Sequence, residues 1–290
     1  MNNKILDVFN LFRIGQWYKN FLIFIPIFTA AKFFDQRLFW ITVFGFFSIS
    51  FISSATYIFN DIIDIKKDLL HPEKKNRPIA SGKIKIRPAF IIALLLILSS
   101  FIIAISLKPL FILFPLAIFI STIIYTFYLK NIAIIDLYSI AFNHILRASA
   151  GAFLISVSLS SWFLLFIFLL SMFLATGKRK SDMSVLGNQA KNHKKVYNFY
   201  NKKFLDWLII IFLTSMLVCY ILYSFMAYDH QYFIITIPFA TFLILRYLYF
   251  ISISHKITRK TENLFLDKQM VIGLFLWFAS AFISIYVLGS

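Results

Sequence analysis

Three aspartates stand close together in the stretch "NDIIDIKKDLLHPEKKNRPIASG", which covers residues 60–82. Asp61, Asp64 and Asp68 are spaced three and four residues apart, so a helix over this stretch would carry all three on one face. Carboxylates this close repel one another unless a cation lies between them, and Mg²⁺ prefers a few carboxylates with water and phosphate oxygens. The spacing favours a magnesium site over a solvated helix end in which the two intervening lysines neutralise the aspartates.

Basic side chains follow the aspartates directly. They are His71, Lys74, Lys75, Arg77, Lys83, Lys85 and Arg87. Lys and Arg are the usual partners of phosphate oxygens, and carboxylates for Mg²⁺ beside such cations suit a diphosphate ligand. The general excess of basic residues on the cytoplasmic loops of membrane proteins accounts for part of this group.

A second polar group is "GKRKSDM" at residues 177–183, with Lys178, Arg179 and Asp182. We expect it on the same side of the membrane as the aspartates, so both groups could face one cavity. Lys178 or Arg179 would then clamp a phosphate, although basic residues that merely flank a membrane span look similar.

Asp136, Asn143 and Arg147 share one face of a further predicted helix. An arginine in the middle of a membrane span costs about 2.5–3.5 kcal/mol, so Arg147 must face protein or a wet cavity, which makes it a candidate substrate contact. Asp136 and Arg147 lie about 16 Å apart along the helix axis, so each needs a partner on another element.

Arg246 lies near the end of a different predicted helix and can extend its guanidinium to the membrane surface.

The elements that must position these residues are membrane-spanning helices. The chain is 60% hydrophobic and 19% aromatic, and uncharged stretches of about 18 residues recur. We predict a single all-α, polytopic membrane domain over residues 1–290. It lacks an evident cleavable signal peptide, and its single cysteine, Cys219, excludes disulfides and a cysteine metal site. Its nine expected spans are residues 20–34, 38–59, 89–107, 110–128, 132–155, 161–176, 204–226, 231–251 and 269–288.

The distribution of charge predicts the orientation. If the N-terminus is cytoplasmic, 24 Lys and Arg lie on cytoplasmic segments and three on the opposite side. The net charge of +17 is then a membrane face and not a nucleic-acid patch. We therefore expect a multi-pass protein of the inner (plasma) membrane, with its active site in the cytoplasmic loops 60–88 and 177–203.

"NDIIDIKKD" matches the N-D-x-x-D-x-x-x-D motif of the UbiA superfamily of intramembrane prenyltransferases. Within it, the chain most resembles the branch of decaprenyl-phosphate phosphoribosyltransferases. The further similar segments are "QWYKN" at 16–20, "HPEKKNRPIASG" at 71–82, "YTFYLK" at 125–130, "LRASAGA" at 146–152, "GKRKSDM" at 177–183, "RYLYF" at 246–250 and "DKQMVIGLFLW" at 267–277. The resemblance therefore extends over nearly the whole chain.

The resemblance implies nine helices around a central cavity, with the Asp-rich motif at its mouth. It assigns Asn60, Asp61, Asp64 and Asp68 to a Mg²⁺–diphosphate site, in which the three aspartates are catalytic metal ligands. It assigns phosphate contacts to Lys19, Arg77, Lys130, Lys178 and Arg179. This sequence departs from the family at two places: it has Ile14-Gly15 where Arg-Pro usually precedes Gln-Trp, and Asp182 where Glu is usual.

Two transferase reactions remain open. In the first, a polyprenyl phosphate receives 5-phosphoribosyl from phosphoribosyl pyrophosphate; in the second, an aromatic acceptor receives a prenyl group from a prenyl diphosphate. Aromatic prenyltransferases of the superfamily carry a second Asp-rich motif after span 6, whereas here residues 177–203 hold one acid and eight Lys or Arg. Cations in that loop suit a ligand with an extra phosphate and favour the phosphoribosyl reaction.

A transporter would explain the spans, but not a cytoplasmic carboxylate triad followed by a phosphate-type loop. The expected partners are Mg²⁺, phosphoribosyl pyrophosphate, a polyprenyl phosphate lipid and the membrane. A homo-oligomer is compatible with these features, and nucleic acid is not an expected partner.

Overall fold

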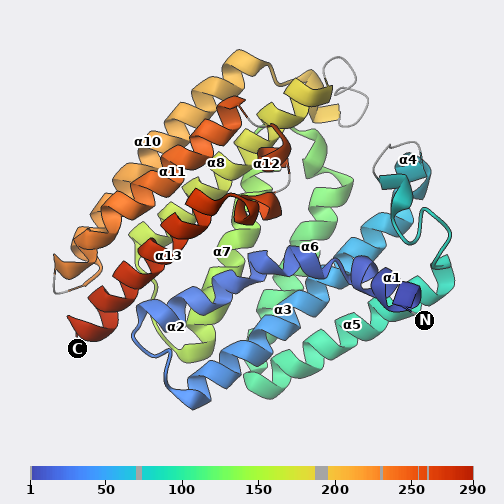
Figure 1. Ribbon diagram of the computed structural model, residues 1–290. Helices are drawn as coiled ribbons and strands as arrows, with labels where there is room; N and C mark the ends of the chain where they lie inside the picture. The colour runs from blue at the N-terminus through green and yellow to red at the C-terminus, as the bar shows by residue number, and fades with distance from the viewer. Residues whose placement is uncertain are drawn as a thin grey trace. The chain divides into compact units, whose positions relative to one another are not determined.

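The computed structural model describes residues 2–69, 74–186, 195–228, 231–253, 255–259 and 261–289, and every regular element in these ranges is helical (Figure 1). The predicted all-α fold class is therefore confirmed. The chain forms two compact units. Unit 1 is Met1–Phe127 with Leu146–Val157, and unit 2 is Tyr128–Ile145 with Ser158–Ser290.

Unit 1 contains the aspartate motif and the helices before it. Its elements are the α-helices α1 (Asn2–Phe12), α2 (Ile25–Thr29), α3 (Gln36–Ile63), α4 (Ile65–Leu69), α5 (Ile86–Leu107) and α6 (Leu113–Phe127), the 3₁₀ helices η1 (Ile14–Phe24), η2 (Lys74–Asn76) and η3 (Pro109–Ile112), and the second half of α7 (Ile135–Ile155). Asp35 caps the start of α3, because its Oδ1 accepts a hydrogen bond from the backbone N–H of Leu38 at 3.1 Å.

The helices α3 and α5 run side by side in unit 1 (Figure 1). Each hydroxyl of Ser48 and Ser100 donates to the other residue's backbone carbonyl, at 2.9 and 2.7 Å. Neither hydroxyl is therefore left unsatisfied in this buried contact. An apolar core packs around them, formed by buried residues that include Ile23, Ile49 and Phe111.

Unit 2 begins with the first half of α7. Its other elements are the 3₁₀ helices η4 (Leu129–Asn131), η6 (Lys195–Asn198), η7 (Gln231–Thr236) and η8 (Thr261–Leu266), the α-helices α8 (Ser161–Leu186), α10 (Lys202–Met226), α11 (Ile237–Ile253), α12 (His255–Arg259) and α13 (Lys268–Phe282), and the π-helix Ile283–Val287. The helices α8 and α10 pack along each other.

Arg246 in α11 has a specific partner, which the sequence interpretation missed. Its Nη2 donates to Oδ2 of Asp267 at 2.8 Å, and Asp267 Oδ1 in turn caps α13 by accepting from the backbone N–H of Met270. The hydrogen bond from Arg246 holds the pKa of Asp267 below its usual range. Arg246 lies within α11 and not at its end, and it therefore joins this helix to the start of α13.

Seven helices in the described part of the chain are long and apolar enough to cross a membrane, so the protein is a multi-pass membrane protein. They cover Gln36–Ile63, Ile86–Leu107, Pro109–Phe127, Ser161–Val185, Lys202–Met226, Gln231–Ile253 and Lys268–Val287. The expected count of nine is not confirmed. The predicted span 20–34 is divided between η1 and the short α2. The predicted span 132–155 corresponds to α7, which carries the polar residues Asp136, Asn143, His144 and Arg147 among others.

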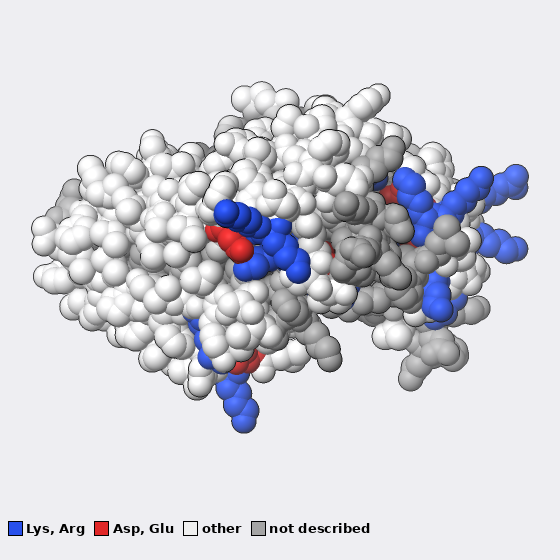
Figure 2. All heavy atoms as spheres, turned by 90° about the horizontal axis from the view of Figure 1, so that it is seen from above, with Lys and Arg blue, Asp and Glu red and all other residues white. Residues whose placement is uncertain are grey.

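The face of the molecule seen in Figure 2 is largely uncharged, as expected for helices that face lipid. Figure 2 shows broad white areas and a few groups of basic side chains with acidic atoms beside them. Along α5 the exposed side chains include Phe90, Leu94, Leu98 and Ile102. These residues recur about once per helical turn and give the helix a continuous apolar face.

Candidate active site

The three aspartates lie on both sides of a break in the helix. α3 ends at Ile63, Asp64 follows with φ −92° and ψ 11°, and α4 starts at Ile65. Asp61 therefore lies in α3 and Asp68 in α4, and Asp64 is the residue that connects the two helices. The expectation of one continuous helical face is wrong at this point, because the chain turns at Asp64.

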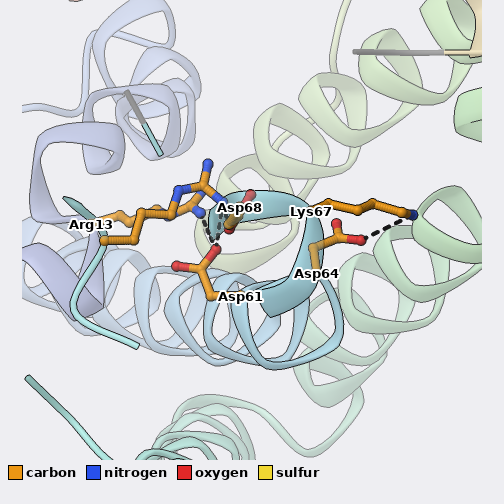
Figure 3. A network of polar contacts seen from close by, with 6 residues as sticks. Arg13, Asp61, Asp64, Lys67 and Asp68 are labelled. Atoms are coloured by element: carbon orange, nitrogen blue, oxygen red, sulfur yellow. Dashed lines mark hydrogen bonds and ion pairs between the residues drawn. The ribbon is translucent and has the colours of Figure 1, made fainter. Parts of the chain in front are cut away.

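Asp61 and Asp68 point toward a shared position. One guanidinium nitrogen of Arg77, Nη1, lies 2.9 Å from Asp61 Oδ1 and 2.6 Å from Asp68 Oδ2. A second guanidinium, that of Arg13, donates from Nη2 to the same Oδ1 of Asp61 (Figure 3). Both carboxylates are 2% exposed, so the two arginines offset the cost of burying them.

Asp64 is oriented differently. Its Oδ1 lies 3.4 Å from Nζ of Lys67, and Figure 3 shows this pair pointing away from Arg13 and Asp61. The Lys67 side chain is 80% exposed, so the pair is a weak surface ion pair. Asp64 is therefore the most accessible of the three carboxylates.

The donor set of Asp61 and Asp68 fits a divalent cation. Their oxygens converge on one nitrogen of Arg77, so a positive group already lies between them within hydrogen-bond distance. Mg²⁺ is commonly held by one or two carboxylates, with water and substrate phosphates as the remaining ligands. Among the described residues no three Asp, Glu, His or Cys side chains are grouped for a metal, so water and phosphate oxygens would complete the ligand set.

Several of the other basic residues after the motif can be placed. Lys74 lies in η2, where burial and the nearby Arg77 lower the pKa of its ammonium group. Lys83 pairs with Asp7 of α1 at 3.0 Å. His71, which the sequence interpretation included in this group, lies outside the described residues.

The segment "QWYKN" is fixed to α3 by polar contacts with serines. Trp17 Nε1 donates to Ser54 Oγ at 3.0 Å, and Asn20 Nδ2 donates to Ser50 Oγ at 3.0 Å. The predicted phosphate contact Lys19 lies between them and donates to Gln16 Oε1 at 2.8 Å. These contacts hold η1 against the helix that carries Asp61.

Arg147 faces protein, as its position in the middle of α7 required. Its Nε donates to Asn20 Oδ1 at 2.7 Å, and its Nη2 lies 3.5 Å from Ser53 Oγ. The expectation that Arg147 needs a partner on another element is confirmed.

Gly151, one turn further along α7, allows the backbones of α7 and η1 to contact each other. A Cβ at this position would lie 2.0 Å from the carbonyl oxygen of Ile23.

An apolar groove lies between α3 and α6 and reaches Asn60 of the motif. Its volume is about 220 Å³ and its lining is Thr56, Phe59, Asn60, Ile63, Phe119, Thr122, Ile123, Thr126 and Phe127. The three threonine hydroxyls donate to carbonyls of their own helices, which leaves their methyl groups as the surface offered to a ligand. The groove is therefore suited to a hydrocarbon chain.

The predicted contacts Arg179 and Asp182 lie on α8 in unit 2. Arg179 Nε donates to Oδ2 of Asp136 at 2.9 Å, so the expected partner of Asp136 on another element is present. Asp182 accepts from Tyr197 Oη at 2.8 Å and from Arg259 Nε at 3.2 Å. Its shorter side chain, in place of the usual Glu, therefore still reaches two partners.

Two tyrosines of the loop after α8 complete these contacts. Tyr200 Oη donates to Oδ1 of Asp136 at 2.7 Å, as Tyr197 does to Asp182. Burial raises the pKa of both phenols, so both stay protonated donors at neutral pH.

Of the remaining predicted phosphate contacts, Lys130 lies in η4 and Lys178 on α8, and both are partly exposed.

Sequence reasoning missed four residues that hold the predicted ones in place. They are Arg13, Tyr197, Tyr200 and Arg259. Arg13 stands three residues before Gln16 of the "QWYKN" segment, but its contact with Asp61 depends on packing between distant residues. The tyrosines stand three residues apart at the end of a basic loop, where buried partners for Asp136 and Asp182 were needed.

The UbiA prenyltransferase family model matches residues 21–279 of this chain. Decaprenyl-phosphate phosphoribosyltransferase of Mycobacterium tuberculosis is 30% identical over 254 residues, which cover 84% of this chain and 83% of the relative. The protein of the same name from Mycolicibacterium smegmatis is 29% identical over 304 residues, covering 98% and 94%.

A solved structure supports the same fold. A UbiA homolog from Archaeoglobus fulgidus, bound to GPP and Mg²⁺, matches with a TM-score of 0.71 at 18% identity, over 97% of this chain and 100% of that chain. The family match, the relatives and the similar fold thus confirm the resemblance to UbiA prenyltransferases that the sequence indicated. The protein is a membrane transferase and belongs to the UbiA prenyltransferase family.

Proposed function

We propose that this protein transfers a 5-phosphoribosyl group from phosphoribosyl pyrophosphate to a polyprenyl phosphate and releases pyrophosphate. The observation that carries the proposal is the pair of buried carboxylates, Asp61 and Asp68, that converges on one cation position beside an apolar groove. Such a site suits an ionic diphosphate and a lipid together. The names of the mycobacterial relatives support this substrate pair.

The donor's diphosphate would bind at the aspartate motif. Asp61 and Asp68 would hold Mg²⁺, and the accessible Asp64 would join them by turning from Lys67 toward the metal. The metal would neutralise charge on the departing diphosphate. Arg77 and Arg13 offer guanidinium forks to the phosphate oxygens, and Asn60 can donate an amide hydrogen bond to them. These groups bind and orient the leaving group.

The acceptor lipid would lie along the groove between α3 and α6. The groove lies in membrane-spanning segments and one of its lining residues, Asn60, adjoins Asp61. A phosphate head group near the motif and an isoprenoid tail against Phe59 and Phe119, whose rings contact each other, would match this change from polar to apolar lining. Apolar contact with the tail then fixes the head group near the donor.

The chemistry requires little from protein bases. An oxygen of the acceptor phosphate attacks the anomeric carbon of the ribose, a carbon–oxygen bond forms, and the bond to pyrophosphate breaks with its electron pair. A phosphate monoester has a second pKa of about 6, so the attacking oxygen is already ionised near neutral pH. The required protein groups are then cations that stabilise the leaving pyrophosphate.

We propose Lys19 of unit 1 as a phosphate contact, and likewise Lys130, Lys178 and Arg179 of unit 2. One phosphate is that of the donor's 5-position, which a prenyl diphosphate lacks. Arg179 is oriented by Asp136, and Asp182 by Tyr197 and Arg259, so both have fixed positions on α8. We assign the N-terminus and these cations to the cytoplasmic side of the inner membrane, because basic residues concentrate on the corresponding segments.

The proposal is tested with purified full-length protein, phosphoribosyl pyrophosphate, a polyprenyl phosphate and Mg²⁺. Mass spectrometry should detect a lipid-linked phosphoribose together with released pyrophosphate. Filling the groove with Thr122→Trp should raise KM for the lipid more than for the donor. Absence of this product, with turnover of a prenyl diphosphate and an aromatic acid instead, would show that the protein is an aromatic prenyltransferase.

A further inference from the structure

Arg13 and Arg77 bind the carboxylate oxygens that a divalent cation would need. Asp61 Oδ1 accepts from both guanidiniums, and Asp68 Oδ2 accepts from Arg77 at 2.6 Å. A cation that binds these same two oxygens would occupy the position of Arg77 Nη1. Metal and guanidinium therefore exclude each other at this position.

The charges of the four groups already balance. Two carboxylates face two guanidiniums, so adding a divalent cation introduces repulsion from both arginines. Two like unit charges about 4 Å apart repel each other strongly near a protein surface, so an uncomplexed cation gains little there. A cation that arrives with a diphosphate brings new acceptors for both guanidiniums, and arginine binds phosphate oxygens in bidentate geometry.

The two kinds of side chain differ in freedom. The Asp61 and Asp68 side chains are 3% exposed, whereas those of Arg13 and Arg77 are 23% and 27% exposed. The carboxylates are thus held in place while the guanidiniums border open space. Arg13 adds a backbone constraint, because it adopts left-handed φ 50° and ψ 47° between α1 and η1, with its guanidinium 4.7 Å from the Tyr57 ring centre.

From these contacts we propose that Arg13 and Arg77 are specificity-determining residues that make metal and diphosphate bind as one ligand. While Asp61 and Asp68 accept hydrogen bonds from the two arginines, they bind a divalent cation weakly. They bind the cation tightly when a diphosphate accepts the hydrogen bonds of both guanidiniums instead. The inference deepens the proposed function and rests on its assignment of a diphosphate ligand, but it does not depend on which group the diphosphate carries.

The experiment measures Mn²⁺ binding to full-length protein in detergent, by the electron paramagnetic resonance signal of free Mn²⁺, with and without inorganic pyrophosphate. Removing a hydrogen bond to a charged group changes a free energy by about 1.5–3 kcal/mol, or about 10- to 100-fold in affinity. Arg77→Gln should therefore bind Mn²⁺ alone at least about tenfold more tightly than the wild type. Pyrophosphate should strengthen Mn²⁺ binding in the wild type and much less in R77Q.

Lys83→Gln is the matched control, since it removes a cation of the same loop that pairs with Asp7 and not with the motif. It should leave both Mn²⁺ affinities unchanged. If R77Q does not fold, Arg13→Gln is measured instead, with tighter binding of Mn²⁺ alone again expected. Mn²⁺ affinity that is unchanged or weaker in the folded variant overturns the inference.

The result can be separated from that of the proposed function. Coupled binding of Mn²⁺ and pyrophosphate without lipid-linked phosphoribose supports the inference and overturns the assigned donor. Lipid-linked phosphoribose together with uncoupled binding supports the donor and overturns the inference.

Discussion

Arg179 and Asp136 form a buried ion pair in unit 2, with 2.9 Å between Arg179 Nε and Asp136 Oδ2. The two side chains are 3% and 0% exposed, and Tyr200 donates to the other oxygen of Asp136. The pair joins the first turn of α7 to the last two turns of α8, the helix that also carries Lys178. Its energetics can be measured directly.

We expect strong coupling between these two charges. Asp136→Asn or Arg179→Gln alone leaves a buried charge without its partner and should cost about 3–5 kcal/mol of stability. The double variant should lose less than the two single losses combined. Unfolding in detergent micelles checks this, with Tyr200→Phe as a milder comparison that should cost about 1 kcal/mol. Additive losses would contradict a direct interaction.

Gly151 should tolerate no side chain. A Cβ there would lie 2.0 Å from the carbonyl oxygen of Ile23, and a backbone atom cannot move aside as a flexible side chain can. We expect Gly151→Ala to lower the melting temperature clearly and to reduce the yield of folded protein. Gly15→Ala is the matched control, because no atom lies within 4 Å of its added Cβ. Equal melting temperatures for the two variants would refute the close contact.

Asp64→Asn should separate catalysis from folding. Its ion pair with the exposed Lys67 contributes little stability, so expression and melting temperature should stay near wild type. Loss of a carboxylate that we propose supports the metal should lower turnover at least about a hundredfold. Asp35→Asn is the control, since Asn caps α3 as well as Asp does. Full turnover by D64N at ordinary Mg²⁺ would rule out a metal role.

The Arg246–Asp267 pair should make stability depend on acid. Its hydrogen bond holds the pKa of Asp267 low in the folded protein, so the carboxylate stabilises the fold above its unfolded pKa of about 3.9. This contribution is lost as pH falls through the folded pKa. The melting temperature of Asp267→Asn should therefore lie below that of the wild type at neutral pH, and the gap should close in acid. A gap that persists at low pH would be evidence against this linkage.

Much of the architecture was predictable because it follows from composition and periodicity. Long apolar stretches predicted membrane helices, and the axial distance between Asp136 and Arg147 correctly required separate partners. The turn at Asp64 was not predictable, since Ile65, Lys66 and Lys67 are all compatible with a continuing helix. The contact of Arg13 with Asp61 joins residues 48 positions apart and depends on how η1 packs on α3. A contact of this kind cannot be predicted from the residues next to Arg13 in the sequence.

The break after Ile63 also fixes the electrostatic setting of the motif. α3 is 28 residues long, and the aligned peptide dipoles of a helix leave about half an elementary negative charge at its last turn. Asp61 and Asp64 lie at that negative end, where a carboxylate is unfavourable and a cation is favoured. The helix backbone thus attracts positive charge to this place independently of any side chain. Replacing the acidic groups with amides would weaken that attraction without abolishing it.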